Sequence, residues 1–497
     1  MGPTLTGGRR EPFGVRARQF ENDLLRNCWQ RQHFSFKTSD ALSVRKIFWG
    51  MFLTLGGACG VMAQTTPVYS NVMGFDPRPH YTLAECADLA LRQNPNVLIA
   101  KKRLEEAAGA IIEARAGFLP SLISYANYEK LEADYATLAG TVSNRTYVWN
   151  ANLRLTETVF AGGAVRGRMD IARLQKASRT LDYEAVVDQT ILNVRIAFYD
   201  ILRNKSDVTV HEQAVNFFTE QAKNERNRLK VGTGQKLNVL RAEVNLALEQ
   251  SALVDSRNRL RNSYLRLSEL LAIPYSANQD VVPFEIAGEL RYENMPLNLN
   301  DCLARATGHR PELLARADEI DIQRKQLIVD RSELFPHLDL FAGYDVVSEP
   351  SIHAQADYYN GYVAGAAVTW HMFDGFATKG RMHATRARID EAETAFDALR
   401  RSIETDVLRA FRDLQKAEEQ IQTQSANVQL ATDSLKLATG NFSVGLISQL
   451  ELLQSQLDLT RAQTAELSAR YDYNAALARL QRAMGSDFQI TDERMKK

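Results

Sequence analysis

The stretch TYVWNANLRLTETVFAGGAVRGR (146–168) contains an abrupt change of sequence pattern, and this change decides the fold. Before the glycine pair, Trp149, Ala151, Leu153 and Leu155 alternate with polar residues. A period of two predicts a strand with one apolar and one polar face. After the glycine pair the alternation stops, and no proline occurs between Pro120 and Pro274. A tract of that length without a helix breaker predicts a very long helix.

The same order occurs a second time in the chain. VFAGGAVRGR (159–168) aligns with MFDGFATKGR (372–381). Upstream, LAECADLALRQNPNVL (83–98) aligns with LNDCLARATGHRPELL (299–314), and downstream LKVGTGQKLNVL (229–240) aligns with FSVGLISQLELL (442–453). The chain is therefore internally duplicated. The pattern predicts a mainly α fold with a small β part.

The duplication sets the expected organisation of the 497 residues. We expect an extension (1–44), a signal peptide (45–63), a linker (64–80), a first repeat (81–275), a second linker (276–296), a second repeat (297–486) and a tail (487–497). The strands are expected at about 121–130, 146–160, 337–347 and 361–373.

A heptad pattern follows the strands in both repeats. Residues spaced by seven in the first repeat are Val239, Leu246, Leu253, Leu260 and Leu267, and the equivalent positions in the second are Leu452, Leu459, Glu466, Tyr473 and Leu480. This spacing is typical of a coiled-coil seam. We expect paired helices at about 164–230 and 235–272, and again at 377–442 and 448–484, with a Val-Gly reversal between the members of each pair.

The amino-terminal region reads as an export signal. Arg45 and Lys46 precede the apolar run 47–63, which ends in small residues, so Ala63 is the expected last residue removed. A membrane anchor and a lipoprotein signal at Cys59 are the alternatives. Residues 1–44 fit a misassigned start codon better than a real extension. Cys86 and Cys302 occupy matching places in the repeats and are expected to be small buried residues rather than a disulfide.

Composition and motifs argue against several classes of function. The 60 Lys and Arg residues balance 60 Asp and Glu residues, so there is no electrostatic case for a nucleic-acid partner. His211 and Glu212 begin a zinc-type motif, but Val215 stands where the second histidine belongs. Leu237 likewise replaces the third glycine of a dinucleotide fingerprint. We predict no enzyme activity, no cofactor and no metal.

The strands pose a physical problem. Amphipathic strands with aromatic residues near their ends fit a membrane barrel, although a soluble sandwich edge would show the same alternation. Four strands cannot close a barrel in lipid, where every backbone group must be paired. If the strands lie in a membrane, several subunits must pool them.

The duplicated order of helix, strand pair, aromatic-x-Gly turn, long helix and Val-Gly tip resembles the TolC-type outer-membrane efflux and type I secretion channels. The resemblance implies a homotrimer with a 12-stranded barrel in outer-membrane lipid and a periplasmic α-barrel. It also implies a periplasmic adaptor, an inner-membrane ABC, RND or similar transporter, and export of proteins or of drugs and other small molecules. A periplasmic coiled-coil scaffold or adhesin without a pore is the alternative.

The resemblance also assigns roles to residues of this chain. It places the periplasmic entrance constriction at Glu451, Gln454 and Asn238, of which only Glu451 is charged. A trimer would then present one ring of three carboxylates, which favours cations. Phe442 and Ile447 match the family's aromatic and basic closing partners. The predicted adaptor-contacting tips are Val231, Gly232, Val444 and Gly445, and the strand-to-helix turns are Phe160, Gly162, Phe373 and Gly375.

Overall fold

The computed structural model describes residues 79–130, 147–274, 284–293, 295–348 and 358–485, all within one compact unit, Asp76–Lys497. The expected extension, signal peptide and carboxy-terminal tail, with Cys59 and Ala63, lie outside the described residues. None of the described helices combines the length and the apolar character needed to cross a bilayer.

Both repeats contain the same elements in the same order. In the first repeat they are β1 (His80–Tyr81), α2 (Leu83–Gln93), α3 (Pro95–Ala116), β2 (Ser121–Lys130), β3 (Tyr147–Ala161), α5 (Ala164–Lys230) and α6 (Lys236–Leu270). In the second they are β4 (Glu285–Ile286), α7 (Leu299–His309), α8 (Pro311–Ser332), β5 (His337–Ser348), β6 (Tyr358–Thr369), α9 (Ala377–Ser443) and α10 (Gln449–Ala483). At 67 residues each, α5 and α9 are about 100 Å long.

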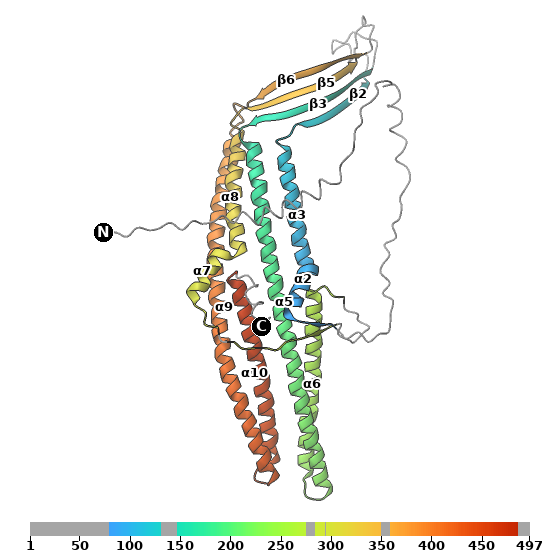
Figure 1. The fold of residues 1–497 in the computed structure, drawn as a ribbon, viewed down its shortest axis with the longest axis vertical. Helices are drawn as coiled ribbons and strands as arrows, with labels where there is room; N and C mark the ends of the chain where they lie inside the picture. Colours follow the sequence, from blue (N-terminus) through green and yellow to red (C-terminus); the bar gives the residue numbers. More distant parts are fainter. Residues whose placement is uncertain (1–78, 131–146, 275–283, 294, 349–357, 486–497) are drawn as a thin grey trace, which may run out of the picture. The chain divides into compact units, whose positions relative to one another are not determined.

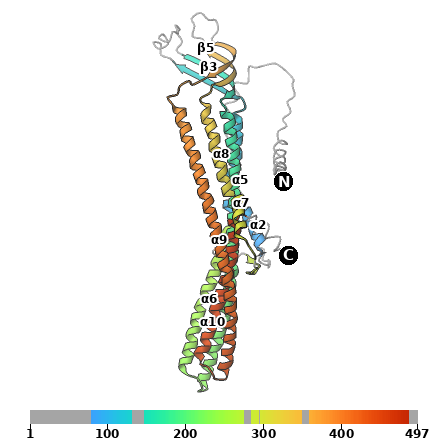
Figure 2. The same ribbon diagram turned by 90° about the vertical axis from the view of Figure 1, so that its left-hand side faces the viewer.

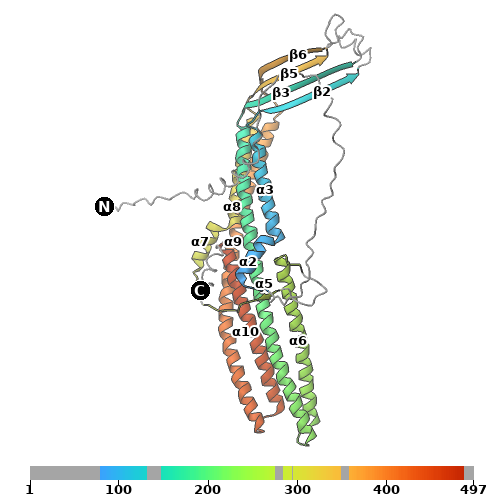
Figure 3. The ribbon, with the colours of Figure 1, turned by 45° about the vertical axis from the view of Figure 1, so that its right-hand side comes forward.

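The helices lie side by side in a layer that is four helices wide (Figures 1 and 3). In the half next to the sheet the order is α3, α5, α8, α9, and in the half that ends in the two tips it is α6, α5, α10, α9. The view in Figure 2 shows α5 and α9 running through both halves. The outer helices are therefore α3 and α9 in the half next to the sheet, and α6 and α9 in the half that ends in the tips.

The sheet is also four elements wide. Its antiparallel order is β2, β3, β5, β6, so the pairing of β3 with β5 joins the two repeats. The ladder between β3 and β5 shifts register between Thr158 and Phe160. Strands β2 and β6 form the edges, and almost all of their residues are exposed.

The last strand is displaced from its expected position. The sequence pattern predicted 361–373, but β6 ends at Thr369, which pairs with His337. Pro336 cannot donate to a ladder, so β5 begins at His337, and β6 has no partner beyond that point. Trp370 instead donates its indole N–H to the Leu334 carbonyl at 3.2 Å.

Six of the ten predicted heptad positions are buried between helices, and the other four, Leu246, Leu260, Leu459 and Glu466, are half-buried. Val239, Leu253 and Leu267 are buried in the first repeat, and Leu452, Tyr473 and Leu480 in the second. Cys86 and Cys302 are buried free thiols, which confirms the expectation of no disulfide between them. Burial raises the pKa of the Cys86 thiol to about 12. Each cysteine packs against the long helix of its own repeat.

Candidate functional site

The two tips reverse the chain by the same local geometry. Gly232 and Gly445 have φ values of +81° and +79°, in the left-handed region that glycine adopts without a steric penalty. Thr233 N donates to the Arg228 carbonyl at 2.9 Å, and Leu446 N donates to the Asn441 carbonyl at 2.9 Å. These bonds satisfy carbonyls at the ends of the long helices. Val231 and Val444 remain 74% and 69% exposed, so both tips present an apolar side chain.

Glu451 is part of the cap that starts α10. Its Oε2 accepts from Ser448 N at 3.1 Å, while its own N–H donates to Ser448 Oγ at 3.4 Å. This reciprocal pair is a capping box. The carboxylate is exposed and held at the tip, and the helix N-terminus also favours a negative charge there.

The other two predicted entrance residues lie near the starts of α10 and α6. Gln454 is one turn further along α10 and donates to Asp458 Oδ1 at 2.9 Å. Asn238 is on the first turn of α6, and its carbonyl accepts from Gln449 Nε2 at 3.3 Å. That bond brings the starts of α6 and α10 together within one subunit. The assignment of these residues to an entrance constriction stays a prediction.

A contact between the two tips was not expected from the sequence. The Arg228 guanidinium lies 4.8 Å from the centroid of the Phe442 ring. Arg228 Nη1 also donates to Glu225 Oε1 at 3.3 Å, and Glu225 is only 1% exposed. Phe442, which the resemblance assigned to closure, therefore contacts a basic residue of α5. The resemblance had placed the basic partner at position 447, where this chain has Ile447.

The strand-to-helix turns differ between the repeats. Gly162 has φ +57°, and a Cβ there would lie 2.5 Å from the Ser332 carbonyl oxygen, so α8 packs directly on this turn. Gly375 has φ +67° with open space around it. Phe160 and Phe373 are 47% and 74% exposed, so both turns carry an exposed aromatic ring.

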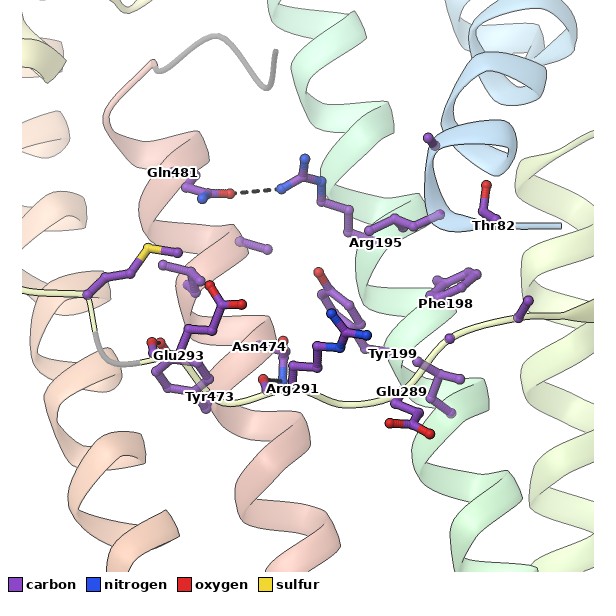
Figure 4. Close-up of a pocket in the computed structure, with 18 residues that line it drawn as sticks. Thr82, Arg195, Phe198, Tyr199, Glu289, Arg291, Glu293, Tyr473, Asn474 and Gln481 are labelled. Carbon is purple, nitrogen blue, oxygen red and sulfur yellow. Dashed lines mark hydrogen bonds between the residues drawn. The ribbon is translucent and has the colours of Figure 1, made fainter. Parts of the chain in front are cut away.

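The structure also contains a cavity of about 390 Å³ that the sequence did not predict. It lies between α5, α10 and the segment 287–293, which crosses both helices (Figure 4). Arg195 is 3% exposed and donates to Gln481 Oε1 at 2.8 Å. Asn474 holds the crossing segment through the Arg291 carbonyl at 3.0 Å, and Tyr473 does so through the Glu293 carbonyl. Among the described residues, no cluster of His, Cys, Asp or Glu side chains could hold a metal ion.

A comparison with protein-family models places this sequence in a known family. The model described as outer membrane efflux protein matches residues 86–272 and 302–486, which is most of the chain. The chain belongs to this family. The two matched segments correspond to the two copies of the duplicated unit.

Individual members of the outer membrane efflux protein family are distant relatives. Protein CyaE of Bordetella pertussis is 23% identical over 335 residues, covering 67% of this chain and 69% of that protein. Outer membrane protein TolC of Vibrio cholerae is 22% identical over 410 residues, covering 81% and 90%. The crystal structure of the CmeC outer membrane channel of Campylobacter jejuni superposes with a TM-score of 0.71 at 15% identity, covering 84% of this chain and 89% of that one.

Family membership establishes the general function. The protein is an export channel of the outer membrane, and its long helices extend into the periplasm. A scaffold or adhesin without a pore is not supported, because both repeats match the channel family over nearly their whole length.

Proposed function

We propose that three copies of this chain close into one continuous tunnel through which cargo leaves the cell. The observation that carries the proposal is the constant width of the subunit: the sheet and both halves of the helical layer are each four elements wide. Three copies would supply twelve elements at every level. A ring that closes at one level therefore closes at all levels.

The outer helices of each subunit carry apolar stripes that need a partner. On α9, Leu430 and Leu437 are spaced by seven and are 69% and 68% exposed. On α6, Leu237, Val244 and Leu248 are 52–64% exposed. Stripes of this kind are the seams of coiled coils. We propose that α6 of one subunit packs on α9 of the next, a head-to-tail contact that closes by rotation.

The edges of the sheet support the same arrangement. Strands β2 and β6 each have one side without a strand partner within the described residues. Unpaired backbone groups are costly in lipid, so β2 must pair with β6 of a neighbouring subunit. The proposed barrel then has twelve strands.

We propose that the tips dock onto a periplasmic adaptor, which links the tunnel to an inner-membrane ABC, RND or similar transporter. The exposed Val231 and Val444, each held beside a left-handed glycine, give every subunit two similar apolar contact points. Val231→Glu and Val444→Glu should abolish adaptor cross-linking and leave conductance unchanged. Normal cross-linking of both variants would contradict this docking site.

The experiment that tests the tunnel is extraction and reconstitution. The protein should be recovered from outer membranes as a detergent-stable trimer, and it should conduct ions in planar bilayers. Recovery from the soluble periplasm as a monomer would contradict the proposal. The class of cargo would follow from a deletion strain: missing secreted proteins in the culture supernatant indicate type I secretion, whereas increased drug sensitivity indicates efflux.

A further inference from the structure

Both long helices begin with basic residues at the same positions. Arg166 and Arg168 are the third and fifth residues of α5, and Lys379 and Arg381 are the third and fifth residues of α9. All four side chains are exposed. Neither helix has an acidic residue in its first turn, although α2, α8 and α10 all do.

These positive charges do not serve the helices themselves. The amino-terminal end of a helix carries a partial positive charge, so cations in the first turn are unfavourable. The basic residues occur at the same two positions of α5 and of α9, and helix stability does not explain this repetition. The charges must therefore interact with something outside the two helices.

Charges within the subunit do not neutralise these four residues either. In the part of the chain that the structure describes, none of them has a carboxylate within ion-pair distance. Lys379 Nζ lies 5.9 Å from the centroid of the Phe376 ring, and Arg381 Nη2 donates to Thr378 Oγ1 at 2.9 Å. The nearby carboxylate of Asp170 pairs with Lys325 at 3.1 Å.

The packing of α5 sends its two arginines to opposite faces of the helical layer. A Cβ on Gly167 would lie 2.8 Å from Val329 of α8, so the residue between the arginines faces a neighbouring helix. Successive residues of a helix are rotated by about 100°. Arg166 and Arg168 therefore project on either side of that contact, one towards each surface of the layer.

The crossing segment 287–293 identifies the outer surface. Arg195 lines the cavity beneath this segment (Figure 4) and lies 29 residues after Arg166, or about eight turns. The two arginines therefore share one face of α5. A segment that crosses the layer would obstruct a tunnel from inside, so this face is the outer one. By the duplication, Lys379 takes the same orientation on α9, whereas Arg168 and Arg381 face the tunnel.

The outward-facing pair lies at the level of a lipid headgroup. Arg166 follows the end of β3 by five residues, and the third residue of a helix lies only about 3–5 Å along its axis. The headgroup layer on each side of a bilayer is about 5–8 Å thick. Exposed aromatic rings at Phe160, Trp370, Phe373 and Phe376 accompany the cations, as expected at a membrane interface.

We propose that Arg166 and Lys379 bind the anionic headgroup phosphates of phospholipids in the periplasmic leaflet of the outer membrane. A trimer would present six such cations around its circumference. The inference rests on the proposed trimeric channel and adds a lipid-recognition surface to it. The ligand class is a glycerophospholipid with a net negative headgroup.

The test compares two double variants of the full chain. Wild type, R166Q/K379Q and R168Q/R381Q are reconstituted in nanodiscs of mixed phosphatidylglycerol and phosphatidylcholine, and the lipids retained by the trimer are counted by native mass spectrometry. A basic residue near an anionic membrane contributes about fivefold to binding. R166Q/K379Q should lose the preference for phosphatidylglycerol by about tenfold or more, and R168Q/R381Q should keep it.

Two outcomes would overturn the inference. An unchanged preference in R166Q/K379Q would do so, and so would a loss confined to R168Q/R381Q. Trimer mass and single-channel conductance, measured on the same preparations, test the channel proposal independently of the lipid-binding proposal. Normal trimers and currents with an unchanged lipid preference would refute the lipid surface alone.

Discussion

Glu451 combines two properties that can be separated by substitution. Its carboxylate caps α10 through Ser448, and it supplies the negative charge of the proposed entrance. Glutamine can fill the same position of a capping box but carries no charge. Glu451→Gln should therefore lower the cation-to-anion permeability ratio without destabilising the tip. The measurement is the reversal potential in planar bilayers under a salt gradient.

Ser448→Ala provides the matched control for this prediction. It removes the hydroxyl that accepts from Glu451 N and leaves the charge in place. Loss of such a cap costs about 1 kcal/mol, so this variant should loosen the tip while keeping the wild-type ion selectivity. If Glu451→Gln and wild type showed the same permeability ratio, Glu451 would have no role beyond capping.

At the scale of helices and strands, the boundaries of the long helices could be predicted from the sequence. Helix α5 starts directly after Gly162 and Gly163, both with positive φ, and ends just before Gly232. These are local effects of backbone conformation, which depend on a few neighbouring residues. The absence of proline between these glycines allowed the helix to be read as one piece.

Features that depend on packing between distant segments could not be predicted. The end of β6 is set by its pairing with β5, and the Arg228–Phe442 contact joins residues more than 200 positions apart. Their meeting depends on how α5 and α9 each pack against α10, and no local pattern in the sequence encodes that register. The crossing of residues 287–293 over α5 and α10 likewise depends on packing between distant segments.

The Arg228–Phe442 contact should hold the two tips of one subunit together. A cation near an aromatic face contributes about 0.5–1 kcal/mol at an exposed site. Phe442→Leu keeps an apolar side chain and leaves the Arg228–Glu225 pair intact, so it removes mainly this term. We expect the open probability in planar bilayers to rise by about two- to fivefold. An unchanged open probability would show that the contact plays no part in closure.

The Glu312–Arg482 ion pair links the start of α8 to the end of α10 and should make stability depend on pH. Burial alone would raise the pKa of Glu312, but the hydrogen bond and charge of Arg482 outweigh it and hold the pKa below its usual value of 4.5. A carboxyl group with a lowered pKa stabilises the fold above its usual pKa. That stabilisation is lost as the pH falls through the lowered value.

Glu312→Gln tests this linkage. It leaves the buried Arg482 without its counter-charge, and we expect the free energy of unfolding at pH 7 to fall by about 3 kcal/mol. Denaturant unfolding should show the difference from wild type shrinking as the pH is lowered below the usual carboxyl pKa of 4.5. Glu289→Gln, an exposed site on the crossing segment, should unfold like wild type at every pH. A difference that stays constant with pH would contradict the assignment.

At the scale of the whole molecule, the subunit is four elements wide at every level and has two lateral sides. A subunit is a strip whose two sides are unlike: α6 and β2 on one, α9 and β6 on the other. Unlike sides join head to tail, which gives a closed ring or an open helix but not a face-to-face dimer. The strip could be inferred from the strand and heptad patterns, whereas the identity of its outer helices required the structure.

Mixing two variants, one altered on each side of the subunit, tests the head-to-tail arrangement. Leu437→Asp places a charge on the α9 stripe, and Val244→Asp places one on the α6 stripe; both sites are more than half exposed in the subunit. In a head-to-tail ring every subunit uses both sides, so each variant alone should stay monomeric. Their mixture should form heterodimers with one intact junction but no trimers, as measured by native mass spectrometry.

Lys436→Asp, next to the stripe, should still give trimers. Homodimers of Val244→Asp would show that α9 packs on α9, and the proposed ring would then be wrong.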